Sequence, residues 1–257
     1  MALPSGIDTA AKITADVAKK AKEAGQSFIG RYLVPNIKPY DAKALTADEA
    51  KAIHGAGLGI LLCWELTASR AKAGASVGAA DGKTARDLAT AMKIPCSAAI
   101  YFAVDYNAPE RDYGLIEAYL RAAAQAAAPY AIGVYGHYYV CEEMYLRGVT
   151  QNLWQCCAWS GKLISPHAFL YQRQWSGGTE SKAVAAKIGV AVDMNTCGNL
   201  ERARIWMPAA PRPWYAAAQD WAVAKGISDG ERPEDPVTRA EAWTMLQRLY
   251  NSKEESV

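Results

Sequence analysis

The chain has 257 residues, of which 51% are hydrophobic and 21% are charged, and its formal net charge is +2. This length and composition suffice for one full domain core and one small additional module. The small net charge excludes the broad basic surface of a nucleic-acid-binding protein, and no run of about 18 apolar residues predicts insertion into a membrane.

Short apolar runs rich in β-forming residues predict eight strands, near 5–8, 27–33, 58–66, 97–105, 131–135, 152–158, 169–175 and 189–194. Helical patterns separate many of these runs, at 10–24, 46–56, 83–92, 110–127 and 138–147. The connections after 158 and 175 are short and are expected to hold little helix. This alternation predicts an α/β fold, and eight strands favour a closed (β/α)8 TIM-like barrel over an open doubly wound sheet.

Four acidic residues stand at the ends of predicted strands: Asp8, Glu65, Asp105 and Asp193. In a barrel of this kind the loops that follow the strands build the active site, so these carboxylates are expected to converge on one face. A group of carboxylates around one cleft suits glycoside hydrolysis, in which one acts as general acid and another as base, nucleophile or charge stabiliser. We therefore treat all four as candidate catalytic residues.

Each of these residues also has a structural interpretation. An Asp after a strand is commonly a turn former or a helix N-cap, which alone would account for Asp8. Asp193 is explained equally well by an ion pair with Arg31. Glu65 and Asp105 both close strongly apolar strands, and burial there favours a carboxyl with a raised pKa.

The character of the chain changes near Met207, where three prolines occur within seven residues. This composition predicts a linker. Beyond it, 214–224 and 238–250 have the apolar spacing of amphipathic helices, and Thr238 with Glu241 forms a capping-box pattern. The predicted organisation is a barrel over 1–206, a Pro-rich linker over 207–213 and a helical tail over 214–257.

The six cysteines show neither a CxxC pair nor zinc-type spacing with histidine, so we expect reduced thiols and no metal or cofactor. The first strand is predicted almost at the N-terminus, without the basic and apolar regions of a secretory signal. We therefore expect a protein that is made in the cytoplasm and reaches any external target by another route.

The ordered segments GID, WE, YFAVDY, GVYG, LWQ, YQRQW and VDMN resemble the glycoside hydrolase family 25 lysozymes. The resemblance is greater to their relatives in the domain-of-unknown-function 1906, or glycoside-hydrolase-like, family, and it covers roughly residues 4–206. It implies a barrel whose pocket receives a cell-wall glycan, with the four acidic residues at the matched catalytic positions. The candidate substrate-binding residues around that pocket are Arg31, Asn107, Tyr135, His137, Trp154, Gln172 and Trp175.

One departure from the lysozyme pattern affects the chemistry. The lysozymes carry Asp-x-Glu at the end of the fourth strand, where that Glu is the proposed general acid, whereas this chain has Asn107 at that place. An amide cannot donate a proton as a carboxylic acid does. Either Glu65 or Asp105 supplies the acid, or the barrel binds peptidoglycan without cleaving it.

The segment from Trp221 to Tyr250 resembles an S-layer homology motif, with its GISDG turn and its PVTRAE segment. That resemblance implies binding to a secondary wall polymer, and the alternative is a helical hairpin that packs or forms a homodimer. Together these features fit a phage endolysin that reaches the wall at lysis.

Overall fold

The computed structural model describes residues 3–209, 215–231 and 234–254, and side chains up to Asn251. Two compact units are present, one up to Pro208 and one from Ala209 onward. The proposed linker residues 210–213, and Trp214 at the predicted start of the tail helix, lie outside the described residues.

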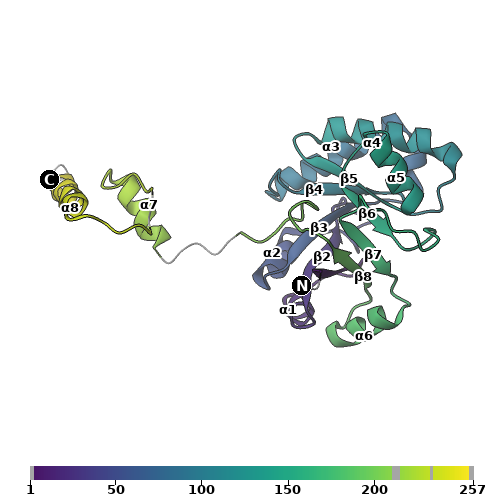
Figure 1. Ribbon diagram of the computed structural model, residues 1–257, viewed down its shortest axis with the longest axis horizontal. Coiled ribbons are helices and arrows are strands. Elements are labelled where there is room, and N and C mark those ends of the chain that lie inside the picture. The colour runs from purple at the N-terminus through teal and green to yellow at the C-terminus, as the bar shows by residue number, and fades with distance from the viewer. Residues whose placement is uncertain (1–2, 210–214, 232–233, 255–257) are drawn as a thin grey trace. The chain divides into compact units, whose positions relative to one another are not determined.

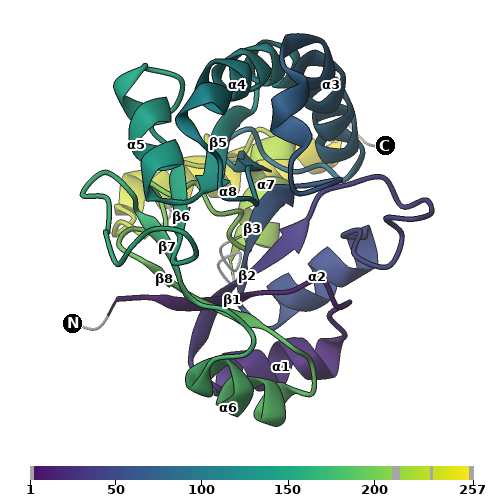
Figure 2. The same ribbon diagram turned by 90° about the vertical axis from the view of Figure 1, so that its right-hand side faces the viewer.

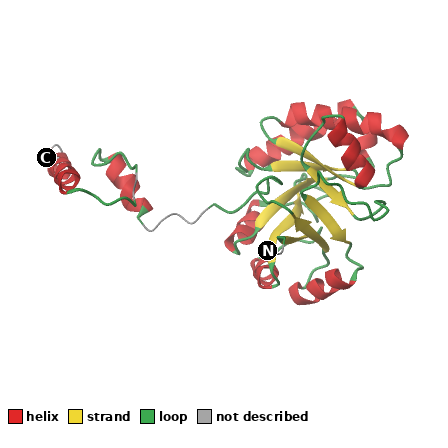
Figure 3. Cartoon of the chain, viewed as in Figure 1, coloured by secondary structure: helices red, strands yellow, loops and turns green. Residues whose placement is uncertain are grey.

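In the described residues of the first unit, eight strands close into a barrel in the order β1 to β8. Figure 3 draws the strands as yellow arrows surrounded by red helices. This confirms the predicted α/β barrel. Helices α3, α4 and α5 cover one side, and α1, α2 and α6 cover the other (Figures 1 and 2). The strands are β1 (Ser5–Asp8), β2 (Gln26–Tyr32), β3 (Gly59–Trp64), β4 (Ala99–Ala103), β5 (Ala131–Gly136), β6 (Leu153–Cys156), β7 (Leu170–Gln174) and β8 (Asp193–Cys197).

The helices of this unit largely follow the predicted pattern. Helix α3 begins earlier than expected, and α6 occupies a connection that was predicted to hold little helix. Residues 157–169, all of them described, contain no helix, as expected for the connection between β6 and β7. The helices are α1 (Ala15–Glu23), α2 (Ala47–Gly55), α3 (Ala75–Ala91), α4 (Tyr113–Ala127), α5 (Tyr138–Leu146) and α6 (Thr179–Ile188), with short 3-10 helices at Arg70–Ala73 and Glu110–Asp112.

The last strand differs from its prediction in both position and direction. We expected Asp193 to end a strand over 189–194, but it begins β8, which pairs antiparallel with both β1 and β7. An antiparallel strand starts at the end of the sheet where its parallel neighbours finish. Asp193 is therefore brought to the C-terminal end of the other strands, although it precedes its own.

The barrel has two apolar layers. One lies between strands and helices and contains Ile60, Ile100 and Val134, whereas the other fills the barrel and contains Phe28 and Tyr101. Small residues make room for the inner rings: a Cβ at Gly6 would lie 2.4 Å from the ring of Phe28, and one at Gly133 would lie 2.4 Å from that of Tyr101. The interior is thus a packed core, and a site can form only at its ends.

The second unit contains α7 (Ala216–Ala224) and α8 (Arg239–Glu254). The predicted capping box at the start of α8 is confirmed, because the Glu241 N–H donates to the Thr238 hydroxyl and the Thr238 N–H donates to the Glu241 carboxylate. Ala216 and Ile227 are buried within the described part of this unit. Large apolar side chains are also exposed there, namely Trp221, Val223, Val237, Trp243, Leu246 and Tyr250.

All six cysteines are free thiols. Among the described residues, no helix is both long and apolar enough to cross a membrane.

Candidate active site

The centre of the candidate site is a pair of carboxylates on adjacent strands. Asp8 ends β1, Asp193 begins β8, and the two residues face each other in the antiparallel pairing. Between them lies the side-chain amide of Gln172 from β7, whose Nε2 donates to Asp8 Oδ2 at 3.0 Å and to Asp193 Oδ2 at 3.1 Å. One amide group therefore bridges the two carboxylates.

Further buried groups fix the orientation of this bridge. The Tyr135 hydroxyl donates to Gln172 Oε1 at 2.7 Å, which directs the amide nitrogen towards the acids. Asn195 Nδ2 donates to Asp8 Oδ2 at 2.6 Å, and the Trp154 indole N–H donates to Asn195 Oδ1 at 2.8 Å. The Trp154 indole N–H and the amide NH2 groups of Gln172 and Asn195 can only donate, which fixes the direction of the hydrogen bonds that they make.

Burial and mutual repulsion disfavour ionisation of the pair. Asp8 is 8% exposed, and burial together with the charge of Asp193 raises its pKa to about 7, against the lowering effect of its two amide donors. Burial also raises the pKa of Asp193, while hydrogen bonds from the backbone N–H and the hydroxyl of Ser176 act in the opposite direction. Two close carboxylates in a desolvated site do not readily ionise together.

Asp105 and Glu65 complete the acidic group from the next strands. Asp105 follows β4, and its N–H donates to the Ala68 carbonyl at 3.0 Å, which ties this loop to the one after β3. Burial, and then the charges of Glu65 and Asp193, raise the pKa of Asp105 to about 6. Glu65 directly follows β3 and forms an ion pair with Lys43, with 3.6 Å between Oε1 and Nζ.

The four acids therefore influence one another electrostatically at one end of the barrel. Near neutral pH, a carboxyl with a pKa of about 6 or 7 has an appreciable protonated fraction and an appreciable ionised fraction. A site that holds acidic groups in both protonation states can donate a proton and also stabilise positive charge. These are the two requirements of general-acid cleavage of an acetal.

Three of the predicted substrate-binding residues lie beneath the acids. Tyr135, Trp154 and Gln172 are 8%, 2% and 6% exposed, and their polar atoms are engaged in the network around Asp8. The prediction that they line an open groove is therefore corrected: these side chains hold the carboxylates in place. The sequence predicted the strands on which these three residues lie. It did not predict that their side chains are buried, because burial depends on how the interior packs.

His137 and Arg31 also differ from their predicted roles. His137 is 2% exposed, and its Nε2 lies 3.2 Å from the Ala108 carbonyl. Arg31 is fully buried and pairs with Glu49, with 2.7 Å between Nε and Oε1, while its other nitrogens bond the carbonyls of Thr9 and Lys43. Arg31 therefore joins β2 to α2 and pairs with Glu49 instead of Asp193. Neither side chain is open to a ligand.

Two predicted contact residues do reach the surface. Asn107 is exposed two residues beyond Asp105, and Trp175 is 65% exposed directly after β7. Their roles in binding stay predictions.

Sequence reasoning missed three residues of the site. Asn195 lies in the quoted segment VDMN, and an Asn two residues after an acid on one strand shares its face, which is a usable signal. Lys43 and Ser176 carried no comparable signal, because both lie in loops.

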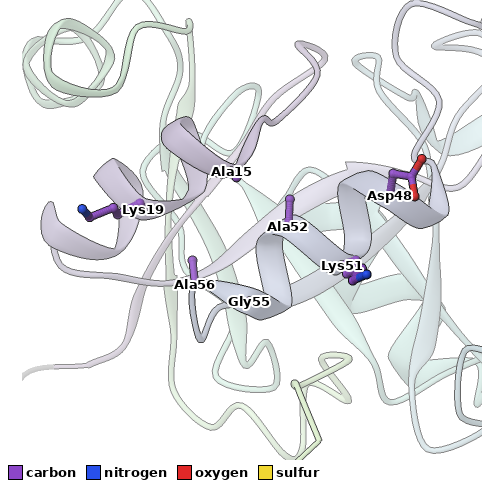
Figure 4. Close-up of a pocket in the computed structure, with 7 residues that line it drawn as sticks. All are labelled: Ala15, Lys19, Asp48, Lys51, Ala52, Gly55 and Ala56. Carbon is purple, nitrogen blue, oxygen red and sulfur yellow. The ribbon is translucent and has the colours of Figure 1, made fainter.

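Another concave region lies away from the acids. A groove of about 600 Å³ runs between α1 and α2, with Lys19 towards one end and Asp48 towards the other (Figure 4). Its walls are outward-facing helix residues, and it contains none of the carboxylates described above. Among the described residues, no group of three or more His, Cys, Asp or Glu side chains is arranged to hold a metal ion.

Fold and site together define a glycoside-hydrolase-like (β/α) barrel with an acidic cluster at the C-terminal end of its parallel strands. Residues 19–255 match the family described as the Rv2525c-like, glycoside hydrolase-like domain, and the chain belongs to this family. No curated protein matches the chain.

The barrel is similar to several crystal structures. The Tat-secreted protein Rv2525c of Mycobacterium tuberculosis, solved with L-tartrate, is 25% identical over 80% of this chain and 100% of that one, with a TM-score of 0.69. The catalytic domain of the endolysin ply40 from Listeria monocytogenes bacteriophage P40 is 13% identical over 78% of this chain and 96% of that one, with a TM-score of 0.50. GHIP of Streptococcus pneumoniae, a glycosyl hydrolase 25, is 14% identical over 78% of this chain and 90% of that one, also with a TM-score of 0.50. The last two similarities concern the fold.

The similarity to Rv2525c corrects one expectation. We expected a product made without a signal peptide and released at phage lysis, but Rv2525c is a Tat-secreted protein, which points to export instead. The N-terminal residues of the chain were an insufficient basis for the earlier expectation.

Proposed function

We propose that this protein hydrolyses the glycan strands of peptidoglycan. The observation that carries the proposal is the convergence of Asp8, Asp105 and Asp193, each with a raised pKa, beside Glu65 at one end of the barrel. The glycoside-hydrolase-like family and the resemblance to lysozymes support a glycan substrate.

The environments of the acids suggest different roles. Asp105 is only partly buried, and its pKa of about 6 suits a general acid that protonates the glycosidic oxygen. Asp193 is also partly exposed and lies where an ionised carboxylate would stabilise an oxocarbenium-like transition state or activate water. Asp8 is more deeply buried and acts through its coupling to Asp193, since Gln172 bridges the two. Glu65 is the alternative acid, and its carboxylate lies 3.6 Å from Lys43 Nζ.

A second candidate function is binding of cell-wall glycan without cleavage. Asn107 favours it, because this exposed amide stands where the related lysozymes have their proposed acid. The acidic cluster would then bind sugar hydroxyls.

For the second unit we propose attachment to a secondary wall polymer, through the S-layer-homology-like segment, or self-association into a homodimer. Support comes from the exposed Trp221, Trp243 and Leu246, since a surface of this kind is typical of an interaction site.

The direct test is release of reducing ends from purified cell walls by the full chain. Mass spectrometry of the products identifies the bond that is cut. Solubilised glycan with new reducing ends supports hydrolysis, whereas retention of the protein on intact walls without new ends supports the binding alternative. Asp105→Asn serves as the inactive control, and Glu110→Gln as the matched variant in the same connection.

A further inference from the structure

Trp159 has an unusual combination of backbone conformation and exposure. It lies three residues after β6, at the same end of the barrel as the acids, and its side chain is 44% exposed. Its φ is +54°, in the left-handed region that bulky side chains rarely adopt. Among the described residues, the other non-glycine positions with positive φ are Lys93, Lys162 and Arg204, which carry flexible cationic side chains.

A buried serine holds Trp159 in this conformation. Ser160 is fully buried, and its hydroxyl donates to the Cys156 carbonyl at 2.6 Å and accepts from the Tyr138 N–H at 2.9 Å. The Ser160 N–H closes the turn on the Cys157 carbonyl. The turn is therefore fixed to β6 and to the start of α5, and it places a partly exposed tryptophan where glycine would be the unstrained choice.

A second exposed indole rises from the neighbouring strand. Trp175 is supported from below by Gly177, where an added Cβ would lie only 1.8 Å from the indole ring. The next residue, Ser176, donates two hydrogen bonds to the Asp193 carboxylate. The Trp175 ring is thus held beside the candidate site with much of its surface open.

Cys157 joins the loops that carry the two indoles. Its N–H donates to the Gln172 carbonyl at 2.8 Å, and its thiol accepts from the backbone N–H of Trp175. The charge of Asp193 also acts on this thiol. Strands β6 and β7 lie side by side in Figure 2, so the connections that carry the two tryptophans leave adjacent strands at the end of the barrel where the carboxylate pair lies.

We propose that Trp159 and Trp175 form a sugar-stacking subsite that binds pyranose rings of a glycan strand on the β6–β7 side of the acids. Flat and partly exposed indoles suit the apolar faces of N-acetylated sugars, while the acids suit the bond between two such rings. The backbone of this turn is already ordered before binding, which lowers the entropic cost of binding. This inference rests on the proposed function for its substrate class.

The test measures binding in the full chain carrying Asp105→Asn, so that the probe is not cut. The probe is soluble glycan of alternating N-acetylglucosamine and N-acetylmuramic acid, titrated by calorimetry. We expect Trp159→Gly and Trp175→Ala each to weaken binding roughly tenfold and Trp159→Phe to weaken it less. Leu146→Ala, at a 72% exposed residue of α5, is the matched control and is expected to bind normally.

Thermal unfolding of each variant shows whether weaker glycan binding comes from a lost contact or from a less stable fold. Because glycine adopts the left-handed conformation freely, Trp159→Gly is expected to keep its melting temperature. Unchanged affinity in this variant would overturn the proposal.

A second measurement does not depend on any variant of Trp159 folding. In 5-fluorotryptophan-labelled protein, glycan is expected to shift the 19F signals of Trp159 and Trp175. The signal of Trp206, whose backbone pairs with Ile60 near the start of β3, should stay in place. A Trp159 signal that does not move at saturating glycan, or the absence of binding, overturns the subsite.

The two proposals can fail separately. If the chain with intact Asp105 binds through both indoles but releases no reducing ends, the hydrolase proposal fails and the subsite stands. If the chain releases reducing ends but glycan binding does not involve the two tryptophans, the hydrolase proposal stands and the subsite fails.

Discussion

At the scale of single residues, the candidate site depends on one amide that contacts two acids. Gln172 donates to both Asp8 and Asp193, and the Tyr135 hydroxyl fixes its orientation. Because the donors to Asp8 only partly offset its burial, the site retains a proton at a pH where an exposed aspartate is fully ionised. The carboxyl groups that hold the proton for the proposed reaction therefore also affect the free energy of unfolding.

Asp105→Asn is expected to lower turnover of wall glycan by at least ~10²-fold, since the amide cannot donate the proton that the proposed mechanism requires. Glu110→Gln, five residues along the same connection and exposed, should retain activity. Initial rates of reducing-end release on purified walls measure both. Near-normal turnover in Asp105→Asn would place the acid elsewhere, with Glu65 as the next candidate.

Asp8 also predicts a dependence of stability on pH. Its pKa in the folded chain is about 7, against an ordinary value of 3.8, so folding favours the protonated form. The stability that this group contributes is fully present below about pH 4 and is lost as the pH rises through about 7.

Asp8→Asn should therefore gain stability relative to the wild type between pH 5 and pH 8, on the order of 2–3 kcal/mol. Urea unfolding at several pH values measures the difference. A gap between the two proteins that stays constant over this range would contradict the raised pKa of Asp8.

At the scale of elements, the reversed strand β8 and the close pair α3 and α4 set the architecture. The antiparallel start of β8 brings Asp193 opposite Asp8, which a parallel strand of the same sequence would not do. Helices α3 and α4 approach so closely that a Cβ at Gly82 would lie 2.4 Å from the Ala123 carbonyl oxygen. The buried Asp81 also joins them, by accepting from the Tyr119 hydroxyl at 2.7 Å.

Gly82→Ala is consequently expected to destabilise the barrel by about 1 kcal/mol or more, because backbone atoms must move to accommodate the methyl group. Gly114→Ala in α4 is the matched control: apart from the adjacent residues and the backbone of its own helix, no atom lies within 4 Å of its added Cβ, and alanine favours a helix by up to about 1 kcal/mol. Chemical unfolding of both variants tests the contrast. Equal effects of the two substitutions would contradict close packing at Gly82.

At the scale of the whole molecule, the chain combines a barrel with a small helical unit of different character. The barrel has an extensive buried core, whereas the helical unit has several large exposed apolar residues. We therefore propose that the first unit carries the chemistry and that the second serves attachment or self-association.

A truncation after Pro208 is expected to keep cleavage of soluble glycan and to weaken sedimentation with intact walls or change the oligomeric state. The cut preserves Trp206, whose N–H donates to the Ile60 carbonyl at 2.9 Å. Wall pull-down and analytical ultracentrifugation compare the truncated and full chains. The assignment fails if neither property changes, or if a folded truncated barrel loses cleavage of the soluble substrate.

Local sequence patterns were sufficient for the barrel and for locating its acidic residues. Apolar runs and helical spacing are encoded over a few neighbouring positions, so seven strands and the ends near Asp8, Glu65 and Asp105 were predictable. The direction of β8 was not, because strand pairing depends on distant segments: Asp8 and Asn195 are 187 positions apart and share a hydrogen bond.

Exposure and choice of partner were also beyond local patterns. Tyr135 and Trp154 occupy the expected strand ends, yet they face inward to support the acids. Arg31 pairs with Glu49 because helix α2, which packs against α1 and β3, turns that carboxylate towards the buried guanidinium. Local preferences specify elements, whereas burial in a close-packed interior assigns each polar group its partner.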